Sequence, residues 1–426
     1  MKVINQLLNQ REKEKNPIQV AVLGSGWYGR GLIAELHRCA GLCPRIIFTR
    51  DTESGVAAYG EAGVEKSHIA VVRSEKDMKN QWASDKYLVT DQNELMKNIP
   101  GIDVFYDATG NIGAGAQAAI DIINQQIHFI TVSAELDCTI GYYLNHLAKE
   151  KGIIYSNSDG DQPGVLARMI EEAKLMGFEI IVAGNCKGFI DVHKTPDDIL
   201  PWVRPGHNSK MVTAFTDGTK QATELTVLAN AYGLTVDQRG MHGPTTTKDT
   251  LVQDFLKIIS RKGIVDYVLG INGVNQGGGV FVIGKREGQR ILADLEYLKK
   301  GPGPYYLFFK DEHMCYFVST TTIVEAALLN VATLAPTQVS TDVVCVAKRD
   351  LKKGEQLDGM GGYMSYGLID NARKAKEENL LPIGLSEGAV LNRDVAQDTP
   401  ISYTMVDYPQ ENFILDLRQK QDALIF

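Results

Sequence analysis

The chain has 426 residues, of which 44% are hydrophobic and 23% are charged, and its formal net charge is −8. These values are typical of a globular protein with roughly two or three domains. The negative charge argues against a broad nucleic-acid-binding surface. The six cysteines include no CxxC pair, which favours free thiols in a reducing compartment over a disulfide framework or a metal site. A charged N-terminus and the lack of a long apolar run predict a cytoplasmic protein without a membrane segment.

Strand-like and helix-like stretches alternate over the first part of the chain. An amphipathic lead-in helix at 1–16 comes first, and buried strands separated by helices are then predicted at 18–24, 44–50, 102–110, 128–133 and 153–158. Residues 51–98 are long for a single crossover and contain helical stretches. The alternation predicts an α/β domain at 1–160, a doubly wound parallel sheet of the Rossmann type.

The pattern changes after residue 160. Strands of a different sheet are predicted at 179–191, at 277–286 and as a pair around Asp311. They indicate an α+β domain at 161–317 for substrate binding and oligomerisation. A helix near 318–336 is expected to return to the first domain. Short β segments joined by turns then predict a small β-rich C-terminal domain at 341–426.

The stretch "VAVLGSGWYG" places glycines at 24, 26 and 29 between a predicted strand and a predicted helix. In this context Gly24 makes a tight turn, Gly26 lets a pyrophosphate approach the backbone, and Gly29 lets helix and strand pack closely. Ligands of parallel sheets lie at the carboxyl ends of the strands. The cofactor-binding residues predicted there are Gly24, Gly26, Trp27, Tyr28, Gly29, Thr49, Arg50, Thr109, Gly110 and Ser133.

The end of the second predicted strand bears on the choice of cofactor. Arg50 could form a charge-assisted fork on a 2′-phosphate, which favours NADP. Asp51 follows directly and keeps NAD possible, because a carboxylate at this position holds the ribose 2′-hydroxyl of NAD. In the next loop, Thr109 could donate a hydrogen bond to the cofactor ribose or amide.

Charged residues near the strand ends are candidates for catalysis. Glu135 and Asp161 follow predicted strands, although Asp161 could equally cap a helix. Lys187 ends an apolar strand beside glycines, where a cationic donor could hold a carbonyl oxygen, a hydroxyl or a phosphate. Asp191 lies in the polar stretch that follows.

A second polar stretch, "RGMHGPTTTKD", places His242 between glycines in a turn. Its hydroxyls and backbone N–H groups precede a helix predicted near Lys248 and would suit a substrate phosphate. A purely structural histidine in a tight turn is the alternative. The chain contains no HExxH motif.

These motifs resemble those of a known family. Nearly the whole chain resembles the 1-deoxy-D-xylulose 5-phosphate reductoisomerase-like oxidoreductases, and its first two domains resemble homoserine dehydrogenase-like enzymes. The C-terminal domain resembles the SAF domain. The matching stretches are "NPIQVAVLGSGWYG", "IDVFYDATG", "AELDCTIGYYL", "GDQP", "TPDD", "GMHGP", "RKGIVDY", "KGPGPY" and "VCVAKRDLKKGEQLD". The relatives carry a second basic residue where this chain has Asn185, so the substrate stays open.

The resemblance implies an NADPH-dependent enzyme of isoprenoid biosynthesis that rearranges a phosphorylated ketose and reduces the resulting aldehyde to 2-C-methyl-D-erythritol 4-phosphate. Its catalytic residues would be Lys187, Glu135, Asp161, Asp191 and His242. Glu135, Asp161 and Asp191 could hold a divalent cation such as Mg²⁺ or Mn²⁺, or Lys187 could polarise the carbonyl instead. His242, Thr245 and Lys248 would bind the phosphate.

Other functions remain open. One alternative is a homoserine dehydrogenase-type enzyme that acts on a small aldehyde, polyol or sugar derivative without rearrangement. A nucleotide sensor or scaffold without catalytic activity is another, although the set of Glu135, Asp161 and Lys187 argues against it. Related folds pair through the substrate domain, so a homodimer or homotetramer is expected.

Overall fold

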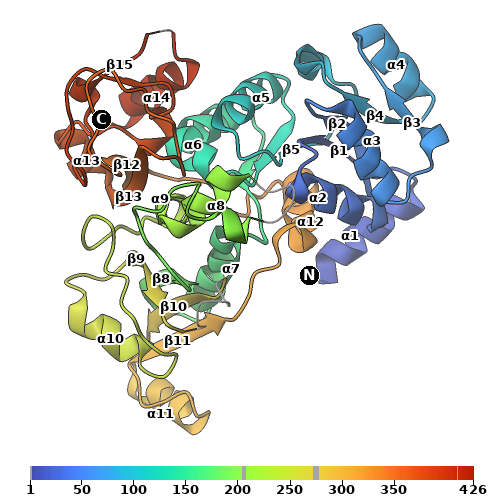
Figure 1. The fold of residues 1–426 in the computed structure, drawn as a ribbon. Coiled ribbons are helices and arrows are strands. Elements are labelled where there is room, and N and C mark those ends of the chain that lie inside the picture. The colour runs from blue at the N-terminus through green and yellow to red at the C-terminus, as the bar shows by residue number, and fades with distance from the viewer. Residues whose placement is uncertain (1, 204–207, 272–277, 410) are drawn as a thin grey trace. The chain divides into compact units, whose positions relative to one another are not determined.

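The computed structural model describes residues 2–203, 208–271, 278–409 and 411–426 (Figure 1). The chain forms two compact units. The first unit comprises Met1–Asp161, Met314–Ala335 and Leu417–Leu424, and the second comprises Gln162–His313, Pro336–Asp416 and Ile425–Phe426. None of the described helices is long and apolar enough to cross a membrane.

The first unit is built on a seven-stranded sheet with the order β3-β4-β2-β1-β5-β6-β7. Its strands, which pair in parallel throughout, are β1 (Ile18–Leu23), β2 (Leu42–Phe48), β3 (Ile69–Val71), β4 (Tyr87–Thr90), β5 (Val104–Asp107), β6 (His128–Thr131) and β7 (Tyr155–Asn157). Its helices are α1 (Lys2–Lys13), α2 (Trp27–Arg38), α3 (Thr52–Glu61), α4 (Glu75–Ala83), α5 (Ile112–Asn124), α6 (Ala134–Glu150) and α12 (Thr320–Val324). The predicted parallel α/β sheet is confirmed.

Two strands of this sheet were not predicted. β3 and β4 both lie within residues 51–98, the stretch for which the sequence indicated only helices. β3 has only three residues, Ile69–Val71, so its apolar run is too short to indicate a strand from the sequence. The stretch of residues 93–98, which was predicted to be helical, is a 3₁₀ helix.

Apolar side chains of the central strands and of α2 form the core of the first unit. Val20 and Val22 of β1 belong to one buried cluster with Leu32 and Leu36 of α2. Alternate residues of a strand point to opposite faces, and a parallel sheet covered by helices is buried on both. This explains why β1 reads as an almost continuous apolar run.

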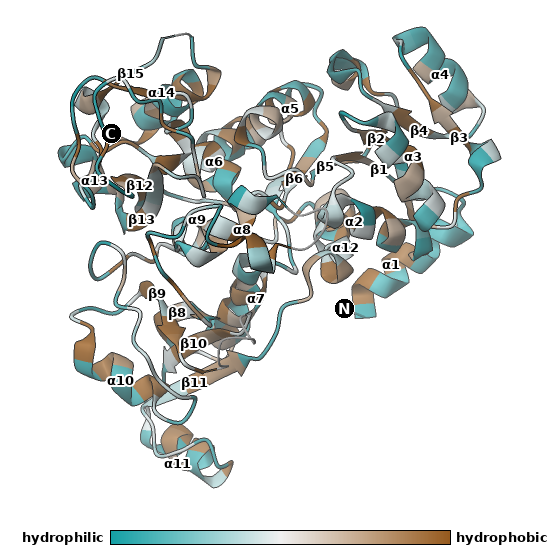
Figure 2. Ribbon diagram, viewed as in Figure 1, coloured by the Kyte–Doolittle hydropathy of each residue, from teal (hydrophilic) through white to brown (hydrophobic). Residues whose placement is uncertain are grey.

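The second unit contains a four-stranded mixed sheet with the order β11-β10-β8-β9. β8 (Glu179–Lys187) runs parallel to β9 (Ile264–Leu269), whereas β10 (Val280–Lys285) is antiparallel to both β8 and β11 (Tyr305–Lys310). The strands β8, β10 and β11 are coloured as hydrophobic in Figure 2, in contrast to the hydrophilic α4 of the first unit. The separate mixed sheet predicted for this region is therefore present.

The helices of the second unit are α7 (Gln162–Leu175), α8 (Ser209–Thr216), α9 (Thr219–Tyr232), α10 (Leu251–Ile258), α11 (Gln289–Tyr297) and α13 (Ala372–Glu377). The predicted strand pair around Asp311 is wrong, because β11 is followed by a 3₁₀ turn at Cys315–Val318 rather than by a second strand. The strand predicted at 277–286 is β10, and Gly277 itself lies outside the described residues.

The C-terminal part of the chain contributes short strands. They are β12 (Thr341–Ala347), β13 (Ser365–Asn371), β14 (Val390–Leu391) and β15 (Val406–Asp407), and α14 (Phe413–Ile425) follows them. β12 and β13 form an antiparallel pair that packs against α9. Residues 336–416 therefore belong to the same compact unit as the four-stranded sheet, and their SAF-like character stays a prediction.

Candidate active site

The glycine turn after β1 has the geometry that the sequence predicted. Gly24 has a φ of +106°, a value that an L side chain rarely adopts. A Cβ atom on Gly29 would lie 2.1 Å from the backbone oxygen of Gly24, whereas one on Gly26 would meet nothing within 4 Å. The turn is thus closely packed beneath and open above Gly26, at the N-terminus of α2. A dinucleotide pyrophosphate fits this combination.

Hydroxyl groups fix the turn from below. The Ser25 Oγ lies 2.7 Å from the Thr49 Oγ1 and donates to the Ser54 Oγ at 2.9 Å. The Arg30 guanidinium donates to the same Ser54 oxygen and forms an ion pair with Glu61. These contacts join the turn to the end of β2 and to α3. Sequence analysis missed Arg30 and Ser54, because neither stands at the end of a strand.

Arg50 and Asp51, the two candidates for cofactor selection, differ in their contacts. Asp51 caps α3, since its side chain accepts a hydrogen bond from the Glu53 N–H at 3.0 Å. Arg50 is exposed, and within the described part of the chain it makes no hydrogen bond or ion pair. The carboxylate at this position is therefore partly used by the fold, whereas the guanidinium is available.

A buried carboxylate organises the loop after β5. Asp107 accepts hydrogen bonds from the Thr109 N–H at 3.0 Å, the Thr109 hydroxyl at 2.7 Å and the Thr131 hydroxyl at 2.9 Å. Burial raises the pKa of Asp107 above its ordinary value. The structure thus gives the Thr109 hydroxyl a partner within the loop, and its predicted donation to the cofactor stays a prediction. Gly110, with a φ of +65°, lets the chain turn here.

Ser133 and Glu135 begin α6. The Ser133 Oγ accepts a hydrogen bond from the Leu136 N–H at 3.1 Å and donates to the Glu135 carboxylate at 3.3 Å. Both side chains are buried. These contacts form an N-terminal cap of the helix, so the structure gives both residues a role in the fold. Their predicted roles in cofactor binding and catalysis stay predictions.

Asp137, one turn further, is fully buried and accepts a hydrogen bond from the Tyr155 hydroxyl at 2.9 Å. Its Oδ1 atom has no hydrogen-bond partner among the described residues. Burial raises the pKa of this carboxyl to about 7. No sequence motif distinguishes Asp137 from an ordinary helix-start aspartate.

Tyr28 and Asp161 lie at a cluster of buried hydroxyls. The Tyr28 hydroxyl is 2.8 Å from the Ser319 Oγ and 3.2 Å from the Tyr106 hydroxyl. Burial raises the pKa of Tyr28 well above its usual value, and the charge of Asp161 adds to this. Trp27, in contrast, is exposed and contacts the edge of Tyr316. The Tyr28 hydroxyl is therefore turned into the protein.

In the second unit, Lys187 ends β8 and has charged and polar neighbours. Its ammonium donates to the Gln162 Oε1 at 2.9 Å and lies 3.5 Å from the Glu224 carboxylate. The Asn185 amide donates to the same Gln162 oxygen at 2.8 Å. The side chains of Lys187 and Glu224 are 11% and 2% exposed, so this ion pair is shielded from water. The four residues come from three elements: β8, α7 and α9.

Sequence analysis found Lys187 in this cluster but not Glu224 or Gln162. The signal for Glu224 was available, because α9 is buried along most of its length and Glu224 is a charged residue within it. A buried charge in a helix interior needs a partner. The stretch "GDQP" pointed to Gln162 only through the resemblance.

The other candidates of the second unit have partners of their own. His242 lies 2.9 Å from the Asp237 carboxylate, and its backbone N–H donates to the buried Asp266. Lys248 pairs with Asp311 at 2.7 Å. The predicted phosphate site of His242, Thr245 and Lys248 thus has two of its three side chains engaged by carboxylates. This geometry favours the structural histidine.

The structure does not form the predicted cation site. Among the described residues, no three His, Cys, Asp or Glu side chains gather where they could hold a metal ion. Asp191 belongs to a turn, in which it accepts from the His193 N–H at 3.1 Å and lies 3.8 Å from the Lys194 ammonium. Glu135 is used at the start of α6. The predicted ligand set of Glu135, Asp161 and Asp191 therefore finds no support.

Residues 160–318 match the family model described as "Oxidoreductase DRL, catalytic domain". No curated protein matches the sequence. The chain is similar to the solved structure of myo-inositol dehydrogenase from Lactobacillus casei in complex with NAD(H) and myo-inositol, at 12% identity over 63% of this chain and 72% of that chain, with a TM-score of 0.37.

It is also similar to a myo-inositol dehydrogenase from Corynebacterium glutamicum, at 7% identity over 72% of this chain and 88% of that chain, with a TM-score of 0.40. The family match covers the Lys187 cluster, and the glycine turn of the first unit follows β1 of the parallel sheet. The protein is an NAD(P)-dependent oxidoreductase.

Proposed function

We propose that the protein is a dehydrogenase that transfers a hydride between a nicotinamide cofactor and a hydroxyl-bearing small molecule, a polyol or a sugar derivative, without rearranging its carbon skeleton. The observation that carries this proposal is the shielded Lys187–Glu224 pair at the end of β8, 3.5 Å apart. It lies within the segment that matches an oxidoreductase catalytic domain. A dehydrogenase needs a proton donor of this kind.

The chemistry follows from the charge of Lys187. When bound, the cofactor supplies or accepts the hydride. As a carbonyl is reduced, negative charge develops on its oxygen, and a preorganised cation stabilises that charge most strongly where water is excluded. The Lys187 Nζ can give a proton to this oxygen, while its contacts with Glu224 and Gln162 fix its position.

The neighbour of Lys187 supports a hydroxyl-bearing substrate. The Asn185 Oδ1 is buried and has no hydrogen-bond partner among the described residues. A buried acceptor of this kind is normally satisfied by a donor, and a substrate hydroxyl provides one. The hypothesis of a phosphorylated substrate has less support, since His242 and Lys248 are already paired with carboxylates. For this reason we favour the dehydrogenase over the reductoisomerase.

For the cofactor we propose NADP, on the basis of the exposed Arg50 at the end of β2, which has no partner among the described residues, and of the capping role of Asp51. The open backbone at Gly26 would hold the pyrophosphate. We also keep the homodimer or homotetramer as a proposal, which light scattering of the purified protein tests.

A substrate panel with both cofactors tests the proposed function. The purified protein is incubated with linear and cyclic polyols, sugar aldehydes, homoserine and 1-deoxy-D-xylulose 5-phosphate, and the nicotinamide absorbance is followed. Turnover of a polyol or a sugar derivative is the expected result. Turnover of the ketose phosphate alone would favour the reductoisomerase, and cofactor binding without turnover of any compound would contradict an enzyme of either kind.

A further inference from the structure

The loop after β8 is held by residues that lie outside the segment matching the catalytic domain. We call residues 188–198 the β8 loop. His193 is 2.8 Å from the Asp398 carboxylate, the Lys194 carbonyl accepts a hydrogen bond from Lys348, and Asp197 accepts one from the Tyr363 hydroxyl at 2.8 Å. Thus three residues of the C-terminal part of the chain contact one short loop.

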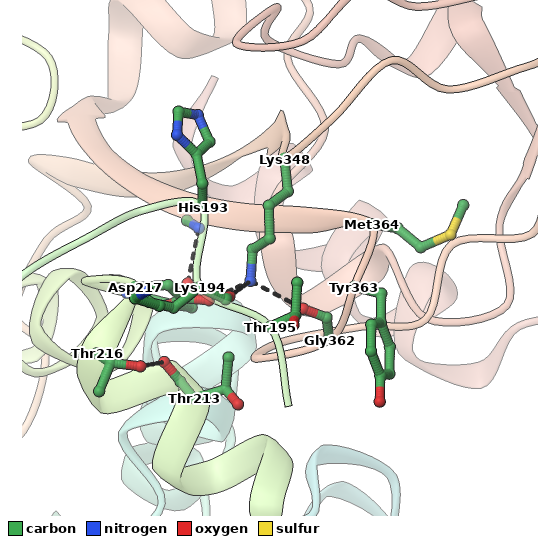
Figure 3. Close-up of polar contacts among 12 residues, drawn as sticks. His193, Lys194, Thr195, Thr213, Thr216, Asp217, Lys348, Gly362, Tyr363 and Met364 are labelled. Carbon is green, nitrogen blue, oxygen red and sulfur yellow. Dashed lines mark hydrogen bonds and ion pairs between the residues drawn. The ribbon is translucent and has the colours of Figure 1, made fainter. Parts of the chain in front are cut away.

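Lys348 makes the central contact (Figure 3). Its ammonium donates to the Asp217 carboxylate at 2.8 Å, to the Lys194 carbonyl at 2.7 Å and to the Gly362 carbonyl at 2.8 Å. An ammonium has three protons, and all of them are used here. The side chains of Lys348 and Asp217 are 1% and 0% exposed. Two buried charges are tolerated only in such a fully satisfied arrangement.

Lys348 joins two chain segments, one of which continues from Lys187 and the other of which leads to Glu224. Lys194 lies on the β8 loop, which continues directly from Lys187. Asp217 precedes α9, and its other oxygen accepts a hydrogen bond from the Thr219 N–H at the start of that helix, at 2.9 Å. The same helix carries Glu224. One side chain therefore ties the end of β8 to the start of α9.

A contact between the two segments supports this arrangement. The Asp191 N–H donates to the Thr216 carbonyl at 2.8 Å, so the β8 loop also touches the residue before Asp217. The outer contacts at His193 and Asp197 are exposed, and exposed ion pairs and hydrogen bonds add little to stability. The buried Lys348 contacts are the ones that can hold the loop in a single geometry.

We propose that Lys348 is a positioning residue of the catalytic site: through Lys194 and Asp217 it fixes the distance and orientation between Lys187 and Glu224. It acts through other residues and does not touch the substrate. The proposal rests on the function assigned to the Lys187–Glu224 pair. The C-terminal segment thereby becomes part of the catalytic machinery, because the matched domain alone lacks the group that holds its two charged residues in register.

The test compares Lys348→Met with the double variant Lys348→Met/Asp217→Asn. The single change leaves a buried aspartate without its cation, and it can simply prevent folding. The double change removes both charges and restores a neutral interior, but it still lacks the donor to Lys194. Lys352→Met is the control, because Lys352 lies on the same segment and its ion pair with Asp394 is exposed.

We expect the double variant to bind NADPH as the wild type does and its kcat to fall about 10- to 100-fold, as misplacement of catalytic groups does. Trypsin should cleave it faster after Lys194. Lys352→Met should match the wild type in each measurement. Wild-type kcat and wild-type cleavage in the double variant would overturn the proposal. If the wild type itself turns over no compound of the panel, the proposed function fails, and unchanged cleavage after Lys194 would then overturn the positioning role separately.

Discussion

The two units present different kinds of site. In the first unit, the candidate cofactor site consists of backbone groups, hydroxyls and one unpaired guanidinium, and its buried carboxylates Asp107 and Glu135 serve the loops and helix starts. In the second unit, two buried or shielded ion pairs, Lys187–Glu224 and Lys348–Asp217, carry the candidate chemistry and its support. A site that binds a large anion needs donors that never change charge, whereas proton transfer needs titratable groups held in a dry place.

This difference predicts that changes in the two units have separable effects. A variant of the charged pair should lose turnover and keep the cofactor, and a variant of the glycine turn should lose the cofactor. The following variants test whether turnover and cofactor binding can be lost separately.

Among the changes that leave Lys187 in place, the largest effect is expected for Glu224→Gln. The amide keeps the shape of the side chain but removes the charge 3.5 Å from the Lys187 ammonium, so turnover should fall about 100-fold, as is typical for the loss of an acid–base group. Steady-state kinetics with saturating cofactor measure it. Glu172→Gln, on the exposed face of α7, is the control. Equal losses in turnover and cofactor affinity would contradict the separation.

Gly29→Ala should act on the first unit alone. A Cβ atom there would lie 2.1 Å from the Gly24 oxygen, so the turn must open. We expect cofactor affinity to weaken about 30-fold, or about 2 kcal/mol, as measured by fluorescence titration. Gly60→Ala adds the same methyl group where nothing lies within 4 Å and should leave affinity unchanged. Wild-type cofactor affinity in Gly29→Ala would show that the turn does not bind the pyrophosphate.

Arg50→Ala sharpens the assignment within the cofactor site. Loss of the guanidinium should weaken the binding of NADPH about tenfold, as expected for one charge-assisted contact, and should leave the binding of NADH unchanged. The exposed Arg38, at the opposite end of α2, provides the matched control as Arg38→Ala. An unchanged ratio of the two affinities would remove the reason for preferring NADP.

Sequence analysis predicted much of the first unit and less of the second. Glycines 24, 26 and 29 could be read because their roles are local: a turn, an approach and a close packing within a few residues. β3 was missed because its apolar run has only three residues, fewer than a strand usually has. In the first unit the sequence does not reveal which partner a side chain takes, as for the Thr109 hydroxyl, which donates to Asp107.

In the second unit, the decisive contacts join distant parts of the chain. Lys187 could be found at a strand end, but nothing near it in the sequence points to Glu224, and Lys348 lies still further along. The carboxylate partners of His242 and Lys248 were equally hidden. A pairing between elements is set by packing, and local patterns do not encode it.

Asp137→Asn probes a buried carboxyl of the first unit outside the charged pair, and its effect is expected on stability rather than on activity. Its pKa is raised to about 7 in the folded protein, against about 3.9 in an unfolded chain. The folded state therefore holds the proton more tightly, and the wild type loses stability as pH rises from about 4 to about 7. The variant cannot lose a proton and lacks this slope.

Urea unfolding at about pH 5 and about pH 8 measures this difference. We expect the free energy of unfolding of Asp137→Asn, relative to that of the wild type, to be greater at the higher pH. Asp121→Asn, a partly exposed aspartate of α5 that accepts a hydrogen bond from Gln117, should show no such change with pH. Parallel pH profiles of Asp137→Asn and the wild type would mean that folding does not raise the pKa of Asp137.

The most direct test of the account is Lys187→Met, measured for cofactor binding and for a single turnover on the same sample. We expect Lys187→Met to bind NADPH with the affinity of the wild type and to have lost hydride transfer. The control is Lys257→Met, because Lys257 is an exposed lysine of α10, and it should behave as the wild type. Hydride transfer at the wild-type rate in Lys187→Met would contradict the account.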